Sequence, residues 1–77
     1  MMNKLRRKRL SEIAAKIEEL KADLESIQED EEEARDNMPE SLQDSERYEA
    51  MDEACENLGC AIDSLDEALE AIEEASA

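Results

Sequence analysis

Hydrophobic and polar residues repeat in sevens from Tyr48 to Ala75, in the blocks YEAMDEA, CENLGCA, IDSLDEA and LEAIEEA. Each block opens with a core-type residue, carries another at its fourth place and ends in alanine. When the seven places are labelled a to g, the a and d places line one side of a helix. The pattern predicts a long helix whose a/d line packs against a second helix. The alanines at g widen this apolar stripe. They are Ala54, Ala61, Ala68 and Ala75.

A second apolar line precedes this helix, with spacings of three and four residues. Its a and d places are Leu10, Ile13, Ile17, Leu20, Leu24, Ile27, Glu31, Ala34 and Met38. Asn3 suits the N-cap of this helix, and Ser45 suits the N-cap of the later one. Pro39 cannot continue a helix. The sequence therefore predicts one domain over 1–77, with a helix over about 3–36, a connection over 37–44 and a helix over about 45–75.

The expected fold is all-α, an antiparallel two-helix coiled-coil hairpin. If the chain turns near Ser41, the numbers of facing residues add to about 82, and a places face d places. This register pairs Ile13 with Leu69, Leu20 with Ile62 and Ile27 with Cys55, so that these layers are apolar. It also brings the Tyr48 hydroxyl close to Glu31, the one carboxylate in the line. We expect Leu42 to cover the end of the core.

A hairpin uses only one side of the apolar stripe on the second helix. The alanines at its g places are left over, and small residues allow another helix to approach closely. A chain of 77 residues also buries a thin core, which self-association would extend. We therefore expect a homodimer with a four-helix core.

The charge of the chain is −15, from 24 acids and nine bases. Residues 1–9 hold five of the bases, between Lys4 and Arg9, and no acid. In a hairpin they lie beside the acidic end of the second helix, where we expect them to pair; the alternative is a contact with nucleic acid or a lipid headgroup. The acidic remainder disfavours nucleic acid and anionic membrane as partners and favours a basic protein surface.

No catalytic constellation can be assembled from these residues. Histidine is absent, and no glycine-rich phosphate loop is present. Cys55 and Cys60 have no further cysteine or histidine to complete a metal site, so free thiols in a reducing cytoplasm are expected. No stretch is long and apolar enough to span a bilayer. The sequence predicts no enzyme, no metal site, no cofactor and no membrane segment.

Two surfaces of the second helix are candidate binding sites. The first is an acidic face at the b places, for which the alternative is an ordinary solvated surface. It consists of Glu49, Glu56, Asp63 and Glu70. The second is a patch that departs from the polar pattern, made of Asn57, Gly59 and Cys60. Glycine within a helix costs about 1 kcal/mol relative to alanine, which suggests a close contact with a partner there; a tolerated patch of small residues is the alternative.

Three segments carry a resemblance to a known group of proteins. They are MNK at 2–4 before RRKRL at 6–10, NMPESLQ at 37–43 and SERYE at 45–49. Together they resemble small, acidic, two-helix proteins of unknown function that phages, prophages and gut bacteria encode, and the similarity spans most of the chain. The group has no assigned activity, so no site residue is carried over. The resemblance implies a gene of a mobile element, and small acidic proteins of that origin often block host defence or nucleic-acid enzymes.

Three functions follow as hypotheses. The first is a non-catalytic acidic module that occupies a basic groove on a host nucleic-acid or defence enzyme, as anti-CRISPR and anti-restriction inhibitors do. The alternative is a structural or scaffolding module whose function is the homodimeric coiled coil. A third is a nucleic-acid accessory that binds through Lys4 to Arg9.

Overall fold

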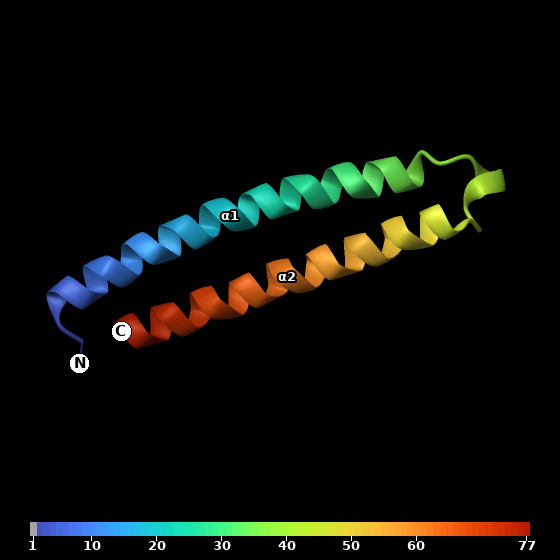
Figure 1. Cartoon of the computed structure of the whole chain (residues 1–77). Coiled ribbons are helices and arrows are strands. Elements are labelled where there is room, and N and C mark those ends of the chain that lie inside the picture. Colours follow the sequence, from blue (N-terminus) through green and yellow to red (C-terminus); the bar gives the residue numbers. More distant parts are fainter. Residues whose placement is uncertain (1) are drawn as a thin grey trace.

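Two long helices form a hairpin in the computed structural model, which describes residues 2–77. Helix α1 spans Lys4–Asp36, a single 3₁₀ turn η1 spans Glu40–Leu42, and helix α2 spans Glu46–Ser76. The helices run in opposite directions, so that both chain ends lie at the same end of a rod whose Cα extents are 59 × 15 × 12 Å (Figure 1). The predicted all-helical hairpin is confirmed, and the helix bounds differ from those expected by at most one residue.

Each helix begins directly after the residue expected to cap it. The Arg6 amide donates to Oδ1 of Asn3 at 2.9 Å, and the Tyr48 amide donates to Oγ of Ser45 at 3.2 Å. Both hydrogen bonds satisfy amides that have no acceptor within the first turn of a helix. The caps explain why the two helices start where they do and why the chain between 37 and 45 stays outside them.

The chain turns through Asn37 and Pro39. The Asn37 amide donates to the Glu33 carbonyl oxygen at 3.0 Å, and the Met38 amide donates to the Arg35 carbonyl oxygen at 3.2 Å, which closes α1. Pro39 precedes the 3₁₀ turn, where the Leu42 amide donates to the Pro39 carbonyl at 2.8 Å. The prediction for Leu42 is wrong: its side chain is 49 % exposed and does not cover the core. The turn geometry directs it outward.

Helix α1 faces α2 with a different side from the one the heptad predicted. The a places Leu10, Ile17 and Leu24 are half-buried, as expected. The d places Ile13, Leu20 and Ile27, however, are 46, 58 and 54 % exposed. The half-buried positions beside the a line are instead at the e places. They are Ala14, Lys21, Gln28 and Arg35. The apolar layers expected for Ile13, Leu20 and Ile27 are therefore wrong.

Polar contacts that the e places of α1 make with α2 explain this rotation of α1. Lys21 forms an ion pair with Asp66, and Nη1 of Arg35 lies 2.8 Å from Oδ1 of Asp52. Gln28 Nε2 donates to the Cys55 carbonyl oxygen at 3.2 Å. These contacts, and the approach of Gln28 to Gly59, join residues whose numbers add to between 83 and 87, not to 82.

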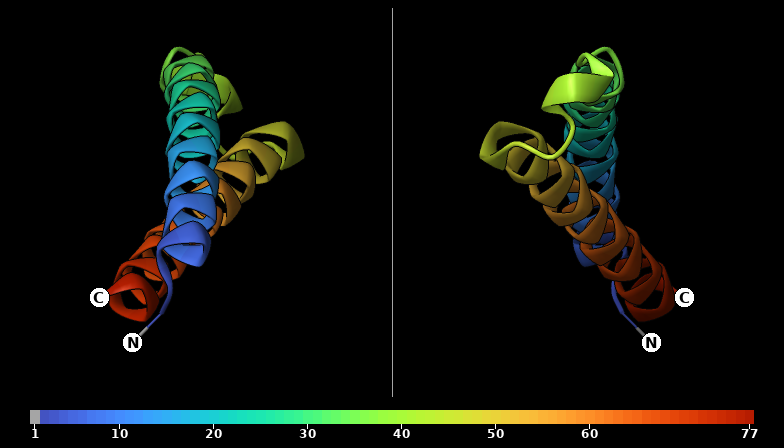
Figure 2. Two further views of the ribbon diagram at one scale, coloured as in Figure 1. Left: turned by 90° about the vertical axis from the view of Figure 1, so that its left-hand side faces the viewer. Right: turned by 90° about the vertical axis from the view of Figure 1, so that its right-hand side faces the viewer.

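The buried core is small and lies in the middle of α2. Only Cys55 and Ile62 are buried among residues 2–77, at 5 and 9 % exposure. The expected hydrogen bond from the Tyr48 hydroxyl to Glu31 does not form, since none of the side-chain hydrogen bonds in the described part of the chain joins them. Both side chains are half-buried at the turn end of the hairpin. The end-on views show the helices inclined to one another (Figure 2), which limits how much of each is covered.

The two cysteines should differ strongly in reactivity. Both are free thiols, with Cys55 buried and Cys60 exposed. We expect an aromatic disulfide reagent to label Cys60 in the native protein at the rate of a free thiol. Cys55 should react at least about 100-fold more slowly, because it must wait for the hairpin to open. Stopped-flow absorbance on Cys60→Ser and Cys55→Ala variants separates the two rates; equal rates would contradict the packing.

The stability of the hairpin should fall at alkaline pH through Cys55. Burial raises the pKa of the Cys55 thiol above its ordinary value of 9.0. As the pH rises past 9.0, the thiol ionises in the unfolded chain before it does so in the folded one, which favours unfolding. We expect the urea midpoint to decline between about pH 8 and 10, and the decline to be smaller in Cys55→Ala. A Cys60→Ser control should keep the full decline.

Candidate functional site

The acidic face of α2 lies on the outside of the hairpin. Glu49, Glu56, Asp63 and Glu70 are all exposed and seven residues apart, so they form one line along the helix. Within residues 2–77 none of the four takes part in an ion pair, since the ion pairs involve Lys21 and Arg35 only. The face therefore presents unneutralised carboxylates to solvent.

The patch of Asn57, Gly59 and Cys60 divides into two parts. Asn57 and Cys60 are exposed, but Gly59 is half-buried and faces α1. A Cβ added at Gly59 would lie 3.2 Å from Nε2 of Gln28. Gln28 in turn donates to the Cys55 carbonyl, the one that accepts the Gly59 amide in a regular α-helix. The close contact expected at Gly59 is therefore made with Gln28 of the same chain. An external partner is not needed to explain the glycine.

The alanines at the g places lie along the other edge of α2. Ala61 and Ala75 are exposed, and Ala54 and Ala68 are half-buried. The e places of both helices meet at one edge of the hairpin, through Lys21 with Asp66 and Arg35 with Asp52. The g places of α2 and the d places of α1 consequently border the opposite edge. The exposed Ile13, Leu20 and Ile27 therefore share an edge with the alanine line.

Sequence reasoning missed the exposed line on α1. The heptad assigned Ile13, Leu20 and Ile27 to the hairpin core together with the a places. A signal was present in the polar residues, because Lys21 and Arg35 stand at e places that can reach the acidic e places Asp66 and Asp52. Pairing these charges, in addition to the apolar residues, indicates which side of α1 turns toward α2.

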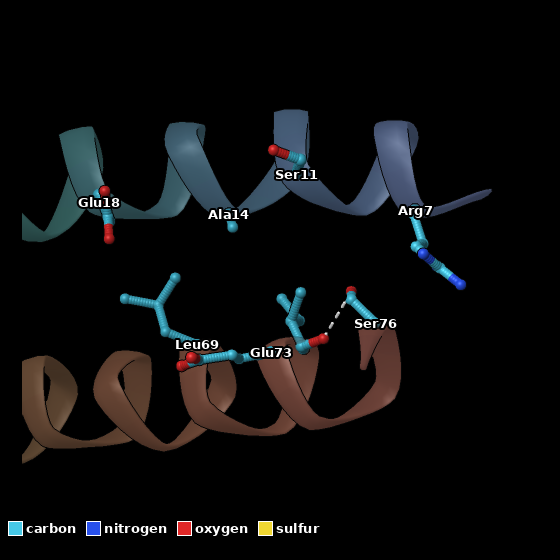
Figure 3. A pocket seen from close by; sticks show the side chains of 8 residues that line it. Arg7, Ser11, Ala14, Glu18, Leu69, Glu73 and Ser76 are labelled. Carbon is cyan, nitrogen blue, oxygen red and sulfur yellow. Dashed lines mark hydrogen bonds between the residues drawn. The ribbon is translucent and has the colours of Figure 1, made fainter. Parts of the chain in front are cut away.

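A groove lies between the helices at the open end of the hairpin, with a volume of about 300 Å³. Figure 3 shows the short side chains Ser11 and Ala14 of α1 across from Leu69 of α2. The Ser76 hydroxyl donates to the Ile72 carbonyl at 2.8 Å and closes the end of α2 (Figure 3). The small residues on α1 leave this space open, and the charged residues Arg7, Glu18 and Glu73 also line the groove.

The basic segment from Lys4 to Arg9 does not pair with the acidic end of α2. Arg7 and Glu73 both line the open-end groove, yet no ion pair among residues 2–77 involves Lys4 to Arg9. All five bases are exposed. The expected ion pairs do not form: the Arg7 and Glu73 side chains extend in opposite directions along the groove (Figure 3). These bases are available to another molecule.

The described part of the chain contains no group of three or more potential metal ligands among its acids and cysteines. No helix within residues 2–77 has the length and apolar character needed to cross a membrane. Comparisons with protein-family models, with curated proteins and with solved structures found no match to this chain.

Gly59 and Gln28 should be energetically coupled. In a Gln28→Ala background, Gly59→Ala should raise the free energy of unfolding by about 1 kcal/mol through helix propensity. In the wild-type background the gain should be smaller by about 1 kcal/mol, because the new methyl group displaces Gln28 from the Cys55 carbonyl. Urea unfolding followed by circular dichroism measures both. Ser64→Ala at an exposed place on α2 is the control and should show no coupling; equal gains for Gly59→Ala in the two backgrounds would contradict the contact.

Proposed function

We propose that this chain is a non-catalytic protein-binding module whose acidic face binds a basic groove. The observation that supports it is the line of exposed, unpaired carboxylates at Glu49, Glu56, Asp63 and Glu70. Packing against α1 does not require these charges, because the helices meet through other places of α2. A nucleic-acid-handling or defence enzyme of a bacterial host is the proposed partner class, and inhibition of the anti-CRISPR or anti-restriction type is the proposed outcome.

Charge density favours a partner that normally binds nucleic acid. A net charge of −15 along a rod 59 Å long is about one charge per 4 Å. Duplex DNA carries one charge per about 1.7 Å. Two hairpins side by side would carry about one charge per 2 Å, close to the density of the duplex. A groove built to bind phosphates would attract such a rod.

We also propose that the hairpin dimerises into a four-helix bundle. The exposed Ile13, Leu20 and Ile27 support this, since a line of large apolar side chains at a single edge favours association. Dimerisation is compatible with binding a basic partner, because the acidic line and the apolar edge lie on different sides of the hairpin. A purely structural role for the dimer is the second candidate function.

Neutralising the acidic face should abolish partner binding. The variant carries Glu49→Gln, Glu56→Gln, Asp63→Asn and Glu70→Gln. Immobilised wild-type chain is expected to retain basic nucleic-acid-handling proteins from a bacterial lysate at low salt and to release them at high salt. The variant should retain at least about 10-fold less of them, by quantitative mass spectrometry.

A matched control changes the net charge equally on the exposed side of α1. It carries Glu12→Gln, Glu19→Gln, Glu29→Gln and Glu33→Gln. This control should retain the same proteins as the wild type, and any retained nuclease should lose cleavage activity when the wild-type chain is added. Retention that is unchanged in the acidic-face variant would reject the acidic-binder function and leave the structural role.

A further inference from the structure

One edge of the hairpin carries an apolar line on α1, flanked by charged side chains, that packing against α2 leaves exposed. Ile13, Leu20 and Ile27 lie seven residues apart on α1 and are each about half exposed. At the N-terminal end of this line, Ile13 and Leu10 border an apolar hollow of about 230 Å³. Arg6 and Arg9 also line this hollow. An apolar line flanked by charged side chains is the form that a helix–helix contact takes.

We propose that a second copy of this chain covers this edge, with the two α1 helices antiparallel about a twofold axis at Leu20. The proposal rests on the dimerisation proposed above and specifies its geometry. In this arrangement Leu20 meets Leu20 of the second copy, and Ile13 meets Ile27 of the second copy. A twofold contact requires that one surface complement itself when reversed, and the spacing of these three residues is symmetric about Leu20.

The charges beside the line have the required complementarity. The g places of α1 are Arg9, Lys16, Asp23 and Asp30, two bases followed by two acids. In an antiparallel pair of helices, the g places of one helix face those of the other. The proposed axis puts Lys16 opposite Asp23 of the second copy and Arg9 opposite Asp30 of the second copy. The symmetry makes four such ion pairs.

The whole of α1 shows the same polarity. Residues 4–16 hold six bases and one acid, and residues 18–36 hold two bases and ten acids. An antiparallel α1 pair places the basic half of each helix on the acidic half of the other. The exposed bases of Lys4 to Arg9, which form no ion pair within the described hairpin, then find acids in the second copy.

The proposed twofold axis is also compatible with the charge pattern on the surface of α2. The observed contacts place Leu20 level with residues 63–67 of α2, which lie between Ala61 and Ala68. From Tyr48 onward, the c and g places of α2 carry no charge. They are Ala50, Ala54, Asn57, Ala61, Ser64, Ala68, Ala71 and Ala75. Two acidic helices can approach along such a side only, and the twofold axis brings the two uncharged sides together while the acidic lines remain outside.

The available area is adequate for a stable dimer. The Cα extents of 59, 15 and 12 Å give the long sides of the rod areas on the order of 700 to 900 Å², comparable with the ~800 Å² that each partner buries in a standard interface. The alternative symmetry, with α1 beside α2 of the second copy, would set the two acid-rich ends next to the connection side by side. That arrangement concentrates like charge, and the antiparallel one disperses it.

Disulfide trapping tests the position of the axis. In a Cys60→Ser background, Leu20→Cys should form a covalent dimer in air, because the two introduced thiols face each other at the axis. The matched control Ile13→Cys should remain monomeric on a non-reducing gel, since the axis separates the two copies of residue 13 by about 20 Å along the helix. Adding Ile27→Cys to Ile13→Cys should restore the covalent dimer.

Charge reversal provides a second test in variants that keep every core residue. Lys16→Glu should weaken the dimer about 10-fold at low salt, measured by sedimentation equilibrium, and adding Asp23→Lys should restore it. Lys8→Glu, which changes the charge equally on the opposite side of α1, should have at most a twofold effect. Circular dichroism verifies that each hairpin stays folded.

The outcomes distinguish the proposals. Dimers that do not cross-link through Leu20→Cys, or that are not rescued by Asp23→Lys, would overturn this geometry while dimerisation stands. A chain that stays monomeric at all concentrations would overturn both. Neither result bears on partner binding by the acidic face, which the neutralised variant tests separately.

Discussion

The contacts of three α1 side chains with α2 determine how the hairpin is built. Lys21 pairs with Asp66, Arg35 pairs with Asp52, and Gln28 donates to the Cys55 carbonyl. Partly exposed ion pairs contribute little stability individually. Their effect is on geometry, because all three stand at e places and turn the same side of α1 toward α2. With that side of α1 turned toward α2, the d places Ile13, Leu20 and Ile27 must lie at the edge of the hairpin that also carries the g places of α2.

Gly59 is part of this constraint. A larger residue there would meet the Gln28 amide, which approaches to 3.2 Å from the position of its Cβ. The glycine lowers the helix propensity of α2 by about 1 kcal/mol. It stands where the Gln28 side chain lies against the backbone of α2. A residue that departs from the helical pattern therefore marks a close contact between the two helices, next to the buried Cys55.

The fold could be predicted from the sequence almost completely, and the site only in part. Heptads, two N-caps and Pro39 specify two helices and a turn, because each depends on local chemistry. The rotation of α1 about its axis depends on which of several favourable sets of contacts with α2 is the most stable. Ile13 at a d place and Ala14 at an e place lie on either side of the a line, so the sequence pattern allows either to face α2. The exposure of Glu49 and Glu70 followed from the pattern. The exposure of Leu20 did not, because an apolar residue at a d place is ordinarily buried.

Acidity and self-association are linked in this chain by the way charge is distributed. Two chains of charge −15 repel each other, so a dimer requires a contact surface that carries little net charge. Only one edge of the hairpin meets that requirement. There α2 is uncharged at its c and g places from Tyr48 onward, and α1 carries bases and acids in equal number at its g places. The carboxylates at the b places of α2 lie away from this edge. Association through it would therefore increase the charge per unit length of the outer surface without bringing those carboxylates together.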